Sequence, residues 1–255
     1  MTAAALSLGW RLTIYLTAGV GAGIANGIAG GGTFITFPTM LALGVPPVSA
    51  NVSSSVGVLP SYLGGIRGFR RELSIKGPLL RSLVPVCLIG TGLGAFLLLQ
   101  GQPSTFRQVV PWLIGAATVV FALSPWITRR LSHIDHDHPT RRIALQVGVF
   151  AVAVYGGYFG AGLGIMLIAV MGVTLPDDLH TLHGLRNAIS TMINAVAAAI
   201  FVLRAPLNYE AVSMLLIGTL IGGWLGTSLI KRLKPAVVRV LIVAIGAGTA
   251  IYLAV

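Results

Sequence analysis

The stretch GIAGGG at Gly27–Gly32 interrupts an apolar run in the first half of the chain. The stretch GGYFGAGLG at Gly156–Gly164 does the same at the matching place in the second half. Each break follows one apolar segment and precedes an unusually short one. Short, glycine-broken segments in corresponding positions of two halves are typical of a transporter, whose binding site they form near the middle of the bilayer. The two breaks therefore decide the expected fold.

The composition is that of a membrane protein. Of the 255 residues, 55% are hydrophobic and 9% are charged, whereas soluble domains carry about 25% charged residues. Mean hydropathy is +0.90. The formal net charge of +11 does not indicate nucleic-acid binding, because the basic residues lie in short loops between apolar segments. The single cysteine, Cys87, excludes an internal disulfide and is expected to be a small buried apolar residue.

Ten apolar segments can be marked off along the chain. They are Leu12–Ile28, Thr33–Leu43, Ala50–Ile66, Pro78–Leu99, Val109–Ile127, Ile143–Tyr158, Leu163–Leu175, Leu185–Leu203, Tyr209–Ile230 and Ala236–Val255. The second and the seventh would reach only about 16–20 Å as helices, against a hydrocarbon core of about 30 Å. We expect an all-α polytopic membrane protein in which these two segments are half-helices, with their broken backbone buried in protein.

The two halves also resemble each other in sequence. Leu88–Ala95 is similar to Leu220–Thr227, and Ile114–Thr118 is similar to Ile245–Thr249, in the same order. This predicts a first membrane repeat at 1–128, a connecting loop at 129–142 and a second repeat at 143–255. Because each repeat holds five segments, an odd number, the two repeats are expected to be inverted relative to each other.

The positions of the basic residues predict the topology, since cytoplasmic loops carry the excess of Lys and Arg. If each glycine break turns the chain back, 14 of the 17 basic residues fall on one side, and only Arg11, Arg107 and Arg204 fall on the other. If each break is crossed straight through, the basic clusters are split between the sides. The first arrangement is favoured, and it places both termini outside the cytoplasm.

The candidate binding residues lie at the breaks and in the third segment of each half. They are Gly30, Gly31, Gly32, Asn51, Ser53 and Ser54 in the first half, and Gly160, Gly162, Arg186, Asn187, Ser190 and Asn194 in the second. A half-helix N-terminus suits an anion, and the guanidinium of Arg186 can bind an oxyanion through two hydrogen bonds. The alternatives are close helix packing for the glycines, interhelical hydrogen bonds for the polar residues and a surface anchor for Arg186.

Several of these stretches together resemble the TauE/SafE sulfite exporter family. The resemblance rests on Ala50–Ser55, Pro60–Gly65, Arg70–Leu73 and Gly184–Asn187, and it covers the chain from about Gly21 to Leu253. It implies a carrier in the bacterial inner membrane for sulfite, thiosulfate, a sulfonate or a related organic anion. The family's polar motifs map onto Asn51, Ser54, Arg186, Asn187 and Asn194.

The remaining expectations concern coupling, partners and rival functions. No acidic residue lies in the middle of a segment, so proton coupling and uniport along the anion's own gradient both stay open. The expected partners are a small anionic substrate and the lipid bilayer; a homo-oligomer stays open, and no cofactor, resident metal or nucleic acid is expected. An anion channel is the main alternative. Less favoured are a transition-metal transporter using the loop His133–His138, and an intramembrane hydrolase using Ser190 or Ser54 with His183.

Overall fold

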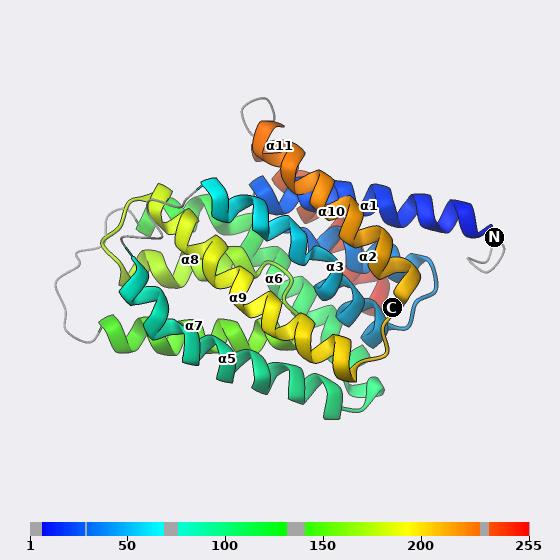
Figure 1. The fold of residues 1–255 in the computed structure, drawn as a ribbon, viewed down its shortest axis with the longest axis horizontal. Helices are drawn as coiled ribbons and strands as arrows, with labels where there is room; N and C mark the ends of the chain where they lie inside the picture. Colours follow the sequence, from blue (N-terminus) through cyan, green and yellow to red (C-terminus); the bar gives the residue numbers. More distant parts are fainter. Residues whose placement is uncertain (1–6, 29, 69–75, 132–140, 230–234, 255) are drawn as a thin grey trace.

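The computed structural model describes residues 7–28, 30–68, 76–131, 141–229 and 235–254, and this part of the chain holds helices and no strand (Figure 1). The helices are α1 (Leu8–Ile28), α2 (Thr33–Ala42), α3 (Pro47–Gly68), α5 (Gly77–Gln100), α6 (Pro103–Leu131), α7 (Arg141–Tyr158), α8 (Leu163–Thr174), α9 (Leu179–Arg204), α10 (Tyr209–Leu229) and α11 (Pro235–Ala254). Each of the ten predicted segments corresponds to one of them. The loop His133–His138 lies outside the described residues.

The lengths of the helices confirm the predicted fold class. The half-helices α2 and α8 have 10 and 12 residues, or about 15 and 18 Å, too short to cross a bilayer. Among the described residues, four helices are long and apolar enough to cross one, namely α5, α6, α9 and α10. The chain is therefore an all-helical membrane protein with two short helices that follow the glycine breaks.

Several helix boundaries differ from the prediction. Helix α9 begins at Leu179, six residues before the predicted Leu185, because Asp178 caps it by accepting a hydrogen bond from the backbone N–H of Thr181 at 3.2 Å. The hydrogen bonds from Thr181 also lower the pKa of the Asp178 carboxyl. Helices α6 and α7 each extend into the predicted loop 129–142, because a helix continues past its apolar stretch into the polar interface.

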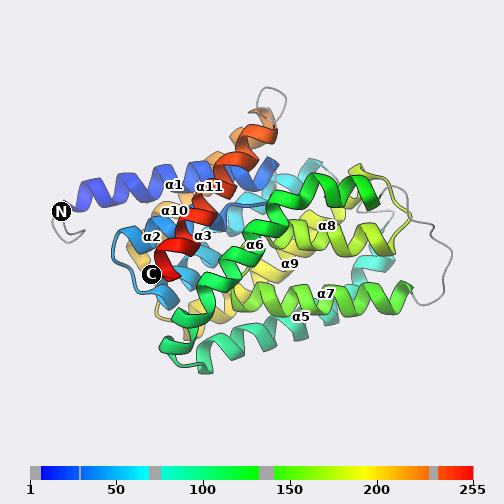
Figure 2. The ribbon, with the colours of Figure 1, turned by 180° about the vertical axis from the view of Figure 1, so that it is seen from behind.

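Several helices begin or end at two opposite ends of the bundle (Figures 1 and 2). We call one the basic end; α5 and α7 begin there, and Lys76 pairs with Asp177 at 2.6 Å. We call the other the termini end, because α1 begins there and α11 ends there. At the termini end Arg11 pairs with Glu210 at 3.0 Å. This agrees with a chain that turns back at each glycine break.

Glycines let two helix pairs approach closely. A Cβ built on Gly23 of α1 would stand 2.6 Å from the carbonyl oxygen of Thr219 in α10. A Cβ built on Gly90 of α5 would stand 2.8 Å from the Cβ of Ala153 in α7. Gly218, Gly222 and Gly226 in α10, and Gly94 in α5, lie against neighbouring backbone in the same way. The small-residue stripes are thus helix-packing surfaces.

The helix pairing is nearly unchanged when the two halves are exchanged. The halves correspond if α1, α2, α3, α5 and α6 are matched with α7, α8, α9, α10 and α11. Under this match the packed pair α1–α10 corresponds to the packed pair α5–α7, and α3–α10 corresponds to α5–α9. The pairs α3–α9 and α6–α11 each join two matched helices, so the exchange leaves them unchanged. The half-helices obey the same rule, since α2 packs on α1, α3 and α11 while α8 packs on α7, α9 and α6. This pattern supports the predicted duplication.

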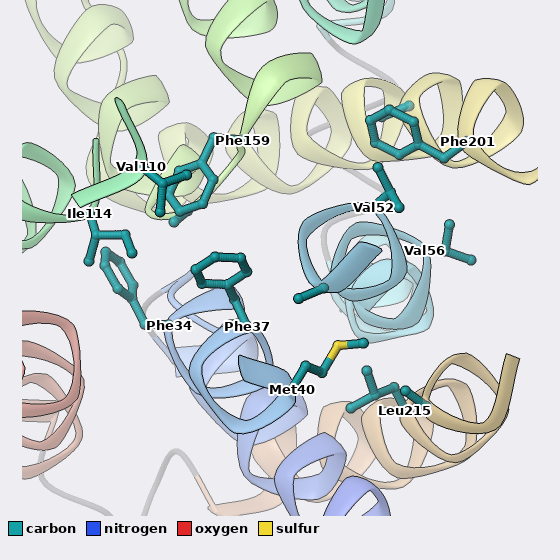
Figure 3. Close-up of a cluster of buried hydrophobic side chains, with 14 of the residues drawn as sticks. Phe34, Phe37, Met40, Val52, Val56, Val110, Ile114, Phe159, Phe201 and Leu215 are labelled. Carbon is teal, nitrogen blue, oxygen red and sulfur yellow. The ribbon is translucent and has the colours of Figure 1, made fainter. Parts of the chain in front are cut away.

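The apolar core surrounds the first half-helix (Figure 3). Phe37 of α2 contacts Phe159 of the second break edge to face, with ring centroids 5.4 Å apart, and Phe34 contacts Phe121 of α6 at 5.7 Å. All four side chains are buried. The second break is therefore packed against the half-helix that follows the first break, which ties the two breaks into one structural centre.

Candidate functional site

Both breaks contain glycines in the left-handed region of backbone conformation. Gly30 has φ +79° in the first break, and Gly160 and Gly162 have φ +79° and +71° in the second. Residues with a Cβ rarely adopt these angles, whereas glycine does so without strain. The sequence predicted these positions as a ligand-facing backbone; the structure gives them a defined conformational role at the start of each half-helix.

The two breaks meet beside Arg186. A Cβ built on Gly30 would stand 3.4 Å from Gly164 Cα and 3.6 Å from Arg186 Nη1. A Cβ built on Gly164 would stand 3.2 Å from Arg186 Cδ. The guanidinium of Arg186 therefore lies where the backbone of both halves comes together. Gly30 and Arg186 are among the predicted binding residues, whereas Gly164 belongs to the second break but not to the predicted set.

Arg186 is buried without an opposite charge. Its side chain is only 3% exposed, and it donates a hydrogen bond from Nη2 to Asn187 Oδ1 at 2.8 Å. It forms no ion pair with any carboxylate of the described residues. A buried charge is costly unless it is paired and hydrogen-bonded. Arg186 is therefore a buried cation that no carboxylate of the described residues neutralises.

Neutral polar groups follow Arg186 along one side of α9. Asn187, Ser190 and Asn194 are spaced three and four residues apart, so they share a helix face, and all are buried. Asn194 Nδ2 donates to the carbonyl oxygen of Ser190 at 2.9 Å. The hydroxyl of Ser190 is buried without a hydrogen-bond partner in the described part of the chain. It is thus an unused donor one turn from Arg186.

The sequence analysis missed Asn26 and Tyr62 as members of this cluster. Asn26 Oδ1 accepts the backbone N–H of Gly32 at 2.6 Å, and Asn26 Nδ2 donates to Ser61 Oγ at 2.8 Å. The hydroxyl of Tyr62 interacts with the side chains of Asn26 and Asn194 and with the charge of Arg186. One signal was present in the sequence: Asn26 is a lone amide in an apolar segment directly before the break.

A chain of polar contacts connects Ser54 to this cluster. The hydroxyls of Ser54 and Thr36 form a short hydrogen bond, and Thr36 Oγ1 donates to the carbonyl oxygen of Gly32 at 3.5 Å. Gly32 in turn is bonded to Asn26. Ser54 and Gly32, two of the predicted residues, are thus joined to the Arg186 cluster through side chains that the prediction did not include.

Three other predicted residues have structural contacts. Asn51 Nδ2 donates to the carbonyl oxygen of Tyr158 at 2.9 Å, which fixes the end of α7, although Asn51 Oδ1 is buried without a partner in the described residues. Ser53 Oγ accepts the backbone N–H of Asn208 at 2.8 Å, in the loop before α10. A Cβ on Gly31 would meet the ring of Phe121 at 2.9 Å. These contacts hold helices together.

Backbone contacts also use N–H groups at the start of both half-helices. Phe34 donates to the carbonyl oxygen of Gly31 at 3.1 Å, and Ile35 donates to that of Gly32 at 2.9 Å. In α8, Ile165 donates to the carbonyl oxygen of Gly162 at 3.0 Å. These three N–H groups are therefore not free to bind a ligand, and the formal positive charge beside the two breaks is the guanidinium of Arg186. Arg186 lies two turns inside α9, and not at a free helix N-terminus as the predicted boundary implied.

The described residues include no group of three or more His, Cys, Asp or Glu side chains placed to hold a metal ion. His183 lies one turn before Arg186 on α9 and is half-buried. The arrangement of donors around Arg186 suits an oxyanion, because a guanidinium, hydroxyls and amide groups all donate hydrogen bonds.

Comparisons with known proteins identify relatives of this chain over most of its length. The model of the family described as "Sulfite exporter TauE/SafE" matches residues 15–253. A "Probable membrane transporter protein" of Haemophilus influenzae is 23% identical over 235 residues, which cover 91% of this chain and 90% of that protein. The "Probable membrane transporter protein YfcA" of Escherichia coli K12 is 24% identical over 234 residues, covering 89% and 83%. No solved structure matches the chain.

Proposed function

The chain belongs to the sulfite exporter TauE/SafE family of membrane transporters, and we propose that it carries a small sulfur-containing or organic oxyanion across the bacterial inner membrane. Sulfite, thiosulfate and sulfonates are the substrates to test first. The substrate binds at Arg186, between the two glycine breaks. The transporter is secondary, and no step of its cycle involves covalent chemistry.

The observation that carries this proposal is the buried guanidinium of Arg186 without a carboxylate partner among the described residues. An oxyanion would supply the missing charge and accept two hydrogen bonds from the guanidinium. Ser190 has a hydroxyl free to donate to the same anion. The substrate would thus complete a site that is otherwise costly to bury.

The helix pairing, which is nearly unchanged when the two halves are exchanged, supports alternating access. Arg186 lies on α9, which packs against α3 of the other half, and the glycine breaks of both halves lie beside it. Rocking of two inverted repeats around one fixed site opens that site to each side in turn. We place the basic end in the cytoplasm, because Lys and Arg are concentrated there. An inside-negative potential then favours export, at about 2.3 kcal/mol per charge per 100 mV.

Flux of labelled sulfite from proteoliposomes tests the proposal. The competitors are thiosulfate, methanesulfonate and sulfate, and the assay is repeated at several pH gradients and voltages. We expect saturable flux with a ranked order of competitors. Arg186→Gln should reduce it by about 100-fold or more, because a bidentate hydrogen bond to a buried charge is lost. Arg107→Gln is the matched control, since Arg107 is exposed at the termini end.

Two outcomes would count against the proposal. Flux that does not saturate would indicate an anion channel. Wild-type flux in a folded Arg186→Gln variant would remove Arg186 from the site. The same assay separates the two modes of coupling without bearing on the site. A flux that depends on the pH gradient would indicate proton coupling, and a flux that depends on voltage alone would indicate uniport.

A further inference from the structure

Two hollows lie one after the other along the outer seam between α5 and α7. The first, of about 440 Å³ at the basic end, is lined in part by Pro78, Ser82, Arg141 and Arg142. The second, of about 300 Å³, is lined by residues of these two helices alone, including Pro85, Ile89, Gln146 and Phe150. On α5 these residues are spaced four, three and four apart, and on α7 Arg142, Gln146 and Phe150 are spaced four apart. Each set lies on one helix face, so the two hollows are adjacent along α5 and α7, and we call them together the groove. The first hollow has a further wall at residues 174–176, where α8 ends.

The packing of α5 on α7 explains why the groove opens toward the basic end. The two helices run parallel and contact each other most closely where Gly90 and Gly94 of α5 meet Ala153 and Val154 of α7. A side chain on either glycine would overlap the other helix. One to three turns nearer the basic end the facing residues are larger, Val86 and Gln146 among them. The two helices are in contact at the glycines and leave a groove between them on the side nearer the basic end.

The groove faces the lipid. Ile89 is 65% exposed and Val147 is 62% exposed, and both line the second hollow. An apolar hollow at this depth of a bilayer is filled by an acyl chain, because an empty one would forfeit dispersion contacts on all its walls. An acyl chain is therefore the occupant of the second hollow.

The charge at the mouth of the groove selects the kind of lipid. Arg141 and Arg142 line the first hollow together, and Arg142 is exposed. Basic pockets between transmembrane helices bind the headgroups of anionic lipids. The second hollow follows the first along α5 and α7, on the side away from the basic end. In a phospholipid the acyl chains extend from the phosphate in the same way.

We propose that the groove between α5 and α7 binds one anionic phospholipid. Its phosphate lies at Arg141 and Arg142, and one acyl chain lies along Pro85, Ile89 and Phe150. The site is separate from Arg186, which lies on α9, and it does not depend on what the protein transports.

Native mass spectrometry of the purified chain tests this site. Phosphatidylglycerol and phosphatidylcholine with the same acyl chains are titrated separately. We expect one phosphatidylglycerol to bind more tightly than phosphatidylcholine, by about fivefold for each arginine. The double variant Arg141→Gln/Arg142→Gln should lose this preference. Arg107→Gln/Arg204→Gln should keep it, because it removes the same charge at the termini end, where both side chains are exposed.

A second variant tests the acyl-chain part without changing charge. Val147→Trp fills the second hollow, and we expect it to abolish the bound phosphatidylglycerol. Val119→Trp is its control, because Val119 is 56% exposed on α6. Retention of the lipid by Val147→Trp would overturn the proposal even if the double arginine variant failed to fold. Equal affinity of the wild-type chain for both lipids would overturn it too. Displacement of the lipid by millimolar sulfite or phosphate would assign the arginines to a soluble anion instead.

Discussion

The guanidinium of Arg186 lies against the backbone of Gly30, so that a Cβ at Gly30 would stand 3.6 Å from Arg186 Nη1. Gly30 lies in the first break of one half, and Arg186 belongs to the third helix of the other half. The contact brings a left-handed glycine and a buried charge from opposite halves together. It is the structural centre from which the predictions for the site follow.

Gly30→Ala should reduce transport more than it reduces stability. The substitution forces a Cβ into φ +79°, at a cost of about 1–2 kcal/mol. It also brings that Cβ toward the guanidinium. Gly44→Ala is the matched control, because Gly44 has φ +80° and lies exposed in the loop between α2 and α3. Flux and thermal unfolding are measured for both. Equal losses of flux would show that only backbone strain matters.

Asn187→Asp should block transport while leaving the fold intact. Asn187 Oδ1 already accepts a hydrogen bond from Arg186 at 2.8 Å, so a carboxylate of the same shape would form an internal ion pair. The site would then have no net positive charge, and we expect flux to fall by about tenfold or more, with unchanged or higher thermal stability. Asn208→Asp is the control, because Asn208 Oδ1 caps α10 by accepting the N–H of Ala211, and a carboxylate can do the same. Undiminished flux in Asn187→Asp would contradict the proposed site.

Competition by anions of different charge should favour monoanions. Arg186 provides one positive charge, and the other groups identified around it are neutral. A second negative charge on the ligand would be buried without a partner, at a cost of several kcal/mol. We therefore expect methanesulfonate to inhibit sulfite flux at lower concentration than sulfate does, at fixed pH and ionic strength. Stronger inhibition by sulfate would indicate a further positive group in the site.

Two neighbouring glycines of α5 should respond in opposite ways to alanine. A Cβ at Gly94 would overlap the carbonyl group of Val154 in α7, so Gly94→Ala should destabilise the protein by about 1–3 kcal/mol. A Cβ at Gly92 meets no atom within 4 Å, so Gly92→Ala should be neutral or stabilise the helix by up to about 1 kcal/mol. Thermal unfolding of both variants in the same detergent measures the difference. A similar loss in both would mean that α5 and α7 are less closely packed than described.

The sequence predicted the helices well because the signals for them are local. Apolar runs, their lengths and the two glycine breaks are each read from a few consecutive residues. The boundaries were less accurate where polar residues continue a helix. Helix α9 begins at Leu179 because Asp178 caps it, and a cap six residues before the apolar run is easily read as part of a loop.

The candidate site was only partly predictable, because helical spacing shows which residues share a face and not what lies opposite. Asn187, Ser190 and Asn194 could be grouped on one face of α9. That Tyr62 and Asn26 complete the same cluster depends on the packing of α3 against α9 and of α1 against α3. Ser53 could not be separated from Ser54 by sequence alone, although the structure directs one to the loop before α10 and the other to α2.

The pairing of α1 with α10 has a consequence for how the protein is made. α1 leaves the ribosome well before α10, the helix that covers its glycines Gly19 and Gly23. Until α10 arrives, the small-residue surface of α1 has only lipid beside it. Neither half can complete its packing alone, because the closest partners of α1 and α5 belong to the other half. Assembly in the membrane must therefore finish after translation of α10, and a chain truncated before that helix would remain a substrate for membrane quality control.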